Sequence, residues 1–198
     1  MIRDRNIQWA RQRMYIPVYN FQGFDDAMAS LADAAPAIVE LDALEHACLP
    51  MAANDSVTHI MGFPSNWDIT KEIGVRVCWT AVAAASATTD AATWIVLYDQ
   101  VDEDELIIAP ATALDTPIVA LDVLGTLDDS PLKITSRGII SADKFDEAAL
   151  DGLFSFNVEL DAVTTFSADE PVLLGIAFDY YPMLTVGPIN TDRDDRVN

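Results

Sequence analysis

The sequence predicts an all-β protein, an antiparallel β-sandwich or closed barrel of about eight strands. Segments in which apolar and polar residues alternate recur along the chain, and this pattern is typical of half-buried strands. Hydrophobic residues make up 51% of the 198 residues, which supports a sizeable core and excludes a disordered chain despite a net charge of −21. Turn-forming residues separate the segments: Pro50, Pro64, Pro117, Pro131, Gly152 and Pro171.

Charge and composition divide the chain into three parts. Residues 1–20 form a basic and aromatic N-terminal arm with four arginines against one acid. Residues 21–182 form the β-domain, in which five basic residues face 28 acidic ones. Residues 183–198 form a polar C-terminal tail with two arginines and three aspartates. No internal repeat or Gly/Ser-rich linker divides the β-domain further.

The arm is the strongest candidate for a binding segment, because Arg, Trp and Tyr are enriched in the buried centres of protein interfaces. For residues 1–13 we expect docking on a neighbouring protein. For residues 15–21 two alternatives stand, continuation of the arm or the first strand of the β-domain itself. The residues expected to bind protein are Arg3, Arg5, Trp9, Arg11, Arg13 and Tyr15.

Eight segments carry the strand pattern. They are residues 36–49, 56–63, 73–79, 92–101, 116–127, 132–141, 153–160 and 172–181. In the last of these, Leu174, Ile176, Phe178 and Tyr180 share one phase and are expected to point inward. Helix is expected to be minor, with candidates at residues 24–35 and in one turn after a possible Ser141 cap.

The same alternation predicts the structural core, which we assign to Trp79, Trp94, Phe156 and Ile176. Trp67 follows a Pro-Ser-Asn turn and is expected to close one end of the sandwich. Asp68 is expected to cap that turn by accepting from nearby backbone amides. Sugar stacking by these tryptophans is the alternative to their core roles.

Catalytic motifs are absent from the sequence, so an enzyme is not expected, and neither is a cofactor or a metal. The histidines, His46 and His59, fall within predicted strands, although Cys48 lies on the same strand face as His46. The acidic run at residues 102–105 lacks the spacing and the glycine of a calcium loop, and is interpreted as a solvated loop.

Composition also bears on partners and compartment. An acidic body repels nucleic acid and anionic lipid, so neither direct nucleic-acid binding nor membrane binding is expected. No signal peptide or membrane-spanning segment is expected, because no long apolar run follows the early arginines or occurs elsewhere. Cys48 and Cys78 could form one disulfide, but two reduced thiols in a cytoplasm are favoured.

From residue 63 to residue 182 the chain resembles structural proteins of phage virions that carry a jelly-roll β-domain. The resemblance lies in a succession of strand residues and not in a catalytic motif. These residues are Pro64, Trp67 and Asp68; Val75, Val77, Trp79, Thr80 and Ala81; Thr93, Trp94 and Val96; the acids 102–105; Phe156, Val158 and Asp161; and Leu173, Leu174, Gly175, Ile176 and Tyr180.

The resemblance implies a jelly-roll-like antiparallel β-sandwich of about eight strands with an extended N-terminal arm. It also implies a capsid decoration (cement) protein on the outer surface of the particle, made in the host cytoplasm and assembled as a homotrimer. Its partner would be the major capsid protein or another virion protein. A tail or fibre component that binds host glycan is the alternative, and a glycan hydrolase acting through two carboxylates is a weaker one.

Overall fold

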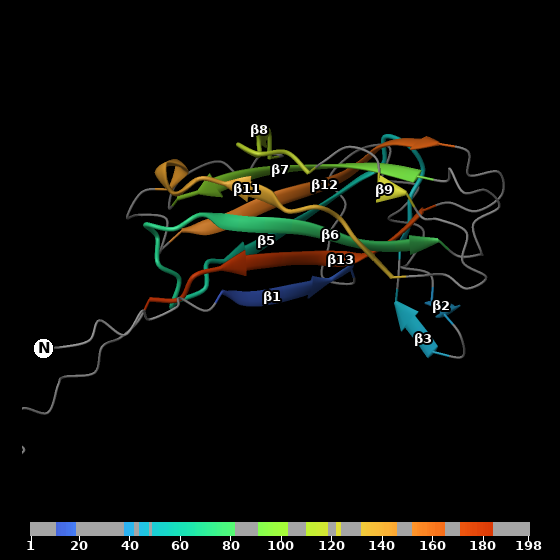
Figure 1. Ribbon diagram of the computed structural model, residues 1–198, viewed down its shortest axis with the longest axis horizontal. Helices are drawn as coiled ribbons and strands as arrows, with labels where there is room; N and C mark the ends of the chain where they lie inside the picture. The colour runs from blue at the N-terminus through green and yellow to red at the C-terminus, as the bar shows by residue number, and fades with distance from the viewer. Residues whose placement is uncertain are drawn as a thin grey trace, which may run out of the picture.

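The computed structural model describes residues 11–18, 38–41, 44–47, 49–81, 91–102, 110–118, 122–123, 132–145, 152–164 and 171–183. Within these ranges the regular structure is almost all β-strand, arranged as antiparallel sheets of which two pack face to face (Figure 1). The predicted all-β sandwich is confirmed. No helix in this part of the chain is long and apolar enough to cross a membrane.

The first sheet has the order β1-β13-β6-β10, with β11 also pairing with β6 and β4 with β13. Its edge strand β1 pairs antiparallel with β13 from Gln12 opposite Tyr180 to Pro17 opposite Gly175. Residues 12–17 thus belong to the β-domain. Of the two alternatives stated above, this is the strand, and the strand begins nearer the N-terminus than expected. Its strands are β1 (Gln12–Pro17), β4 (Leu49–Pro50), β6 (Ile73–Ala81), β10 (Lys133–Ile134), β11 (Gly138–Ile140) and β13 (Pro171–Tyr180).

The second sheet has the order β5-β12-β7-β8, with β9 also pairing with β7. Both of its long central strands, β7 and β12, were predicted from alternation, and they pair with each other over nearly their full lengths. Its strands are β5 (Ser56–Gly62), β7 (Ala91–Val101), β8 (Thr112–Ala113), β9 (Asp122–Val123) and β12 (Leu153–Thr164).

Three predicted segments differ from the structure. Residues 36–49, expected as one strand, contain a hairpin of β2 (Ile38–Leu41) and β3 (Leu44–Ala47) that pairs with neither large sheet. Residues 132–141 are divided between β10 and β11, and within residues 116–127 only β9 is a described strand. The single helical turn is the 3₁₀ helix Ala142–Lys144, but Ser141 does not cap it through its side chain. Residues 24–35 lie outside the described ranges.

The core fills the space between the two sheets. Trp79, Phe156 and Ile176 are fully buried and Trp94 is nearly so. On β12 the predicted inward phase is confirmed, because its even-numbered residues from Phe154 to Leu160 all join the core.

Trp67 is also buried, stacked on Phe63 at 5.3 Å between ring centroids and met edge-on by Phe145 at 4.8 Å. The Asp68 carboxylate accepts from the backbone N–H of Thr70 at 3.1 Å, so the predicted cap of this turn is present.

A β-bulge in β13 changes the predicted phase of one residue. The register between β13 and β6 shifts between Leu173 and Gly175. Leu173 therefore joins the main core, whereas Leu174 packs with Cys78 on the opposite face of the sheet. The expectation that Leu174 points inward with Ile176 was wrong, because strict alternation fails where a strand gains an extra residue.

Gly175 makes this bulge possible, since its φ of +155° is rarely adopted by residues with a side chain. A Cβ atom there would also collide with the backbone carbonyl of Ile16 on β1. We expect Gly175→Ala to lower the free energy of unfolding by about 1–3 kcal/mol, measured by urea denaturation. Gly62→Ala is the matched control, because a Cβ at Gly62 meets no atom within 4 Å and should change stability by less than about 0.5 kcal/mol. Equal stability of the two variants would contradict this account of the bulge.

Candidate protein-binding surface

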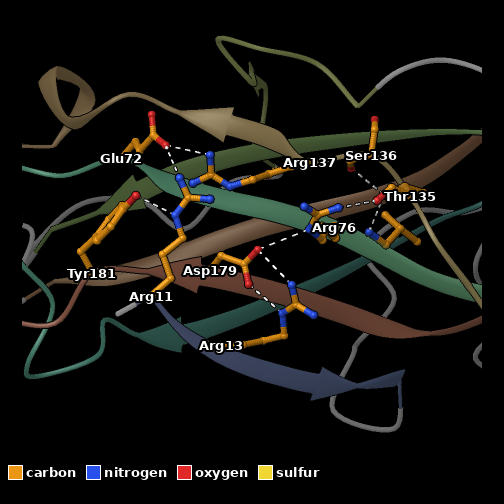
Figure 2. A network of polar contacts seen from close by, with 10 residues as sticks. Arg11, Arg13, Glu72, Arg76, Thr135, Ser136, Arg137, Asp179 and Tyr181 are labelled. Atoms are coloured by element: carbon orange, nitrogen blue, oxygen red, sulfur yellow. Dashed lines mark hydrogen bonds and ion pairs between the residues drawn. The ribbon is translucent and has the colours of Figure 1, made fainter. Parts of the chain in front are cut away.

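Arginine and tyrosine side chains gather on the outer face of the first sheet, the face turned away from the core (Figure 2). Cross-strand register places them in rows. Arg13 on β1 lies opposite Asp179 on β13, which lies opposite Gly74 on β6. The next row joins Tyr15, Ala177 and Arg76. We call this surface the Arg-Tyr face; it consists of Arg11, Arg13, Tyr15, Glu72, Arg76, Arg137, Asp179 and Tyr181.

Asp179 is the centre of the face. Its carboxylate accepts two hydrogen bonds from Arg13, at 2.7 Å from Nε and 3.2 Å from Nη2, and a third from Arg76 Nε at 3.3 Å. Arg76 continues the network by donating to the Thr135 carbonyl at 3.0 Å. The Thr135 hydroxyl in turn accepts from the Val77 backbone N–H at 2.9 Å. The network thereby ties β1, β13, β6 and the segment after β10 together.

Burial and neighbouring charges shift the pKa of Asp179 in opposite directions. This residue is only 5% exposed. Burial by itself would raise the pKa of this carboxyl, but the hydrogen bonds and positive charges of Arg13 and Arg76 outweigh it and hold the pKa below its usual value. Asp179 is therefore ionised at neutral pH, and the two guanidinium groups are held by a buried anion. Beside them, burial raises the pKa of the Cys78 thiol against the opposing charges of the same two arginines.

A second cluster lies beside the first. Arg11 donates through Nε to the Tyr181 hydroxyl at 2.6 Å, and its guanidinium carbon lies 5.2 Å from the centre of the Tyr181 ring. Glu72 pairs with Arg137 at 2.7 Å and with Arg11 at 3.8 Å. The Arg137 guanidinium lies against Gly74, where an added Cβ atom would collide with it. Glu72 and Tyr181 also border a surface depression of about 570 Å³.

The exposed side of the face follows β1. The side chains of Arg11 and Arg13 are 46% and 50% exposed, and Tyr15 is 45% exposed. The Tyr15 hydroxyl nevertheless donates to the Leu174 carbonyl at 2.7 Å, which orients the ring. Four arginines against two carboxylates leave the face with a positive balance on a chain whose net charge is −21. The face therefore presents Arg and Tyr side chains that are partly exposed and held in place. Arg and Tyr are enriched in the hot spots of protein interfaces.

The structure brings together half of the residues that the sequence predicted to bind protein. Arg11, Arg13 and Tyr15 lie on this face and contact residues of the same chain. Arg3, Arg5 and Trp9 lie outside the described residues. Arg76, Arg137 and Tyr181 were not predicted from the sequence, because their place on this face depends on cross-strand register. The one available signal in the sequence was the alternation that places Arg76 on the other face of its strand from Val75 and Val77.

The other candidates for chemistry do not form a site in the described part of the chain. His59 packs its ring against Phe156 at 5.5 Å. Cys78 is a free, buried thiol, and Cys48 lies outside the described ranges, as do the acids at 103–105. Among the residues whose positions are described, no group of three or more His, Cys, Asp or Glu could hold a metal ion. No known protein family matches the chain, and comparison with curated proteins finds no similar sequence.

Proposed function

We propose that this protein is a structural component of a phage particle, a capsid decoration protein that attaches through its N-terminal segment and the adjoining Arg-Tyr face. The observation that carries the proposal is the position of this face, because it includes Arg11 and the exposed side of β1, the part of the chain that follows residues 1–10 in the sequence. The acidic remainder of the body suits the outer surface of a shell, away from the genome. The sequence resemblance supports the same assignment, with the major capsid protein as partner and a homotrimer as the assembled form.

The glycan-binding alternative receives less support. A sugar platform needs aromatic rings that stand on the surface beside polar groups, yet Trp67, Trp79 and Trp94 are all buried. Of the tyrosines on the Arg-Tyr face, Tyr15 and Tyr181 are hydrogen-bonded to the chain itself. A surface of oriented arginines around a buried carboxylate fits a protein partner better.

Deletion of residues 1–10 tests the proposal. We expect the truncated chain to keep its far-ultraviolet circular dichroism spectrum, because β1 begins at Gln12, and to lose incorporation into particles. Incorporation is measured by quantifying the protein in purified particles after complementation of a strain that lacks it. The cut stops before Arg11 because deletion through Arg13 would also remove a partner of Asp179.

Deletion of residues 184–198 serves as the control, since that segment lies at the other end of the chain and is mostly polar. This variant should be incorporated as the full chain is. Normal incorporation of the chain that lacks residues 1–10 would overturn the attachment role. If particles that lack this protein resisted heat and osmotic shock as well as complete particles do, the cementing role would be overturned.

A further inference from the structure

Three side chains along β1, each close to half exposed, form a regular series on the Arg-Tyr face. Arg13 and Tyr15 are two residues apart on this strand and therefore share a face. Arg11, just before the strand, joins the same face through its hydrogen bond to Tyr181 (Figure 2). We call these three residues the β1 series. Residues two apart in an extended chain are separated by about 7 Å, which sets the spacing of the series.

Both arginines of the β1 series are held through one edge of the guanidinium group. Asp179 accepts from Nε and Nη2 of Arg13, and the Tyr181 hydroxyl accepts from Nε of Arg11. Glu72 approaches Nη2 of Arg11 only to 3.8 Å, and no described residue accepts a hydrogen bond from Nη1 of either arginine. Because a guanidinium carries five N–H donors in a fixed fork, each group keeps unused donors. The groups are already oriented, so a ligand that used these donors would order little side chain on binding.

The unused donors and their spacing define the chemistry of a ligand. A carboxylate matches the planar guanidinium fork, and a charged acceptor gives the stronger hydrogen bond. Two carboxylates on alternate residues of an extended segment have the same spacing as Arg11 and Arg13, so both pairs can form at once. Tyr15 continues the series and offers the surface of an oriented ring to an apolar side chain two positions further on. A long phosphate polymer fits less well, because a chain with a net charge of −21 repels it.

We propose that the β1 series binds an extended acidic segment of the partner protein, in which two carboxylate side chains lie on alternate residues and an apolar side chain lies two positions beyond one of them. This inference rests on the proposed function, since it names the chemistry of the coat-protein segment that the Arg-Tyr face contacts. The acidic body does not prevent the contact, because the face itself holds four arginines against two carboxylates and salt screens charges more than about 8 Å away.

Nuclear magnetic resonance titration of the full chain with synthetic peptides tests the inference. The first peptide has two glutamates separated by one threonine, an isoleucine two positions outside each glutamate, and threonine at every other position. The second has the same composition with the two glutamates adjacent, so that their carboxylates point to opposite sides of an extended chain. We expect the first peptide to shift the backbone amide signals of β1 and to bind about tenfold more tightly than the second, because only the first engages both arginines.

Two variants of the full chain locate the binding. Arg11→Gln should weaken binding of the first peptide about tenfold, because it removes one charged donor group. Lys144→Gln is the matched control, since it changes the net charge equally and its side chain is 44% exposed but pairs with Asp115, outside the β1 series. This control should bind the peptide as the wild-type chain does. The comparison of the two peptides needs no substitution, so it decides the question even if Arg11→Gln does not fold.

Four results would overturn the inference. They are no binding of the first peptide, equal binding of the two peptides, tighter binding of a single-stranded oligonucleotide at β1, and self-association of the chain alone that Arg11→Gln abolishes. The last two would assign the β1 series to phosphate or to a second copy.

Particle incorporation separates these failures from failure of the proposed function. If the chain that lacks residues 1–10 is not incorporated while the two peptides bind equally, the attachment role stands and the pairing with alternate carboxylates does not. If the peptides bind as expected while that truncated chain is incorporated normally, the proposed attachment fails and the β1 series remains a binding site for acidic segments.

Discussion

Replacing Trp79 with alanine is expected to lower the free energy of unfolding by about 3–5 kcal/mol, the range measured for large aromatic residues removed from cores. Trp79 is fully buried on the inner side of β6, and its ring lies 6.1 Å from that of Trp94 across the sandwich. The substitution removes this aromatic contact and leaves a cavity between the sheets. Since a domain is stable by only about 5–15 kcal/mol, the variant should be close to unfolding at 37 °C.

Urea denaturation followed by circular dichroism measures this effect. Leu153→Ala provides the control, because Leu153 is a large hydrophobic residue of the central strand β12 that is 41% exposed. Its loss should cost less than about 1 kcal/mol, since its side chain is exposed and does not belong to the core between the sheets. A Trp79→Ala variant as stable as Leu153→Ala would show that the core does not lie between these two sheets.

Replacing Arg13 and Arg76 together with methionine is expected to destabilise the fold by about 3–5 kcal/mol at pH 7, because the buried carboxylate of Asp179 would lose both cationic partners. The effect should depend on pH. In the wild-type chain the pKa of Asp179 is lowered, so its contribution to stability is present above the unfolded pKa of about 4 and is lost as the pH falls through the lower folded value. In the double variant only burial remains, which raises the pKa and lets Asp179 become neutral in mild acid.

The difference in stability between the two proteins should therefore narrow from pH 7 to pH 4, as measured by urea denaturation at each pH. The Asp179→Asn background is the control, since without the carboxylate the same two methionine substitutions should cost much less. A loss that is equal in both backgrounds, or independent of pH, would show that the arginines act through packing alone.

The sequence predicted the long strands well because their alternation is a direct consequence of burial on one face. This holds for β5, β6, β7 and β12, whose apolar positions follow period 2. Strands of two or three residues, such as β8 and β10, are too short to display a period. Leu173 occupies the core position that was expected for Leu174, because β13 contains a bulge. Gly175 was the only sign of this bulge in the sequence.

The candidate surface was predicted in part. Composition identified Arg11, Arg13 and Tyr15, because aromatic and basic residues were concentrated near the N-terminus. It could not identify Asp179 as their anchor, since 166 positions separate that residue from Arg13 along the chain. Such a pairing is set by the register between β1 and β13, and register is a property of the whole sheet.

The Arg-Tyr face also has a consequence for how the molecule meets a partner. Positive side chains gathered on one side of a strongly acidic body give the protein a large electric dipole, which exerts a torque in the field of another charged surface. The molecule would turn its arginines toward an anionic surface before any contact forms, so most encounters would begin in a productive orientation. Added salt shortens the reach of that field to about 8 Å at physiological ionic strength, and the association rate constant should fall accordingly.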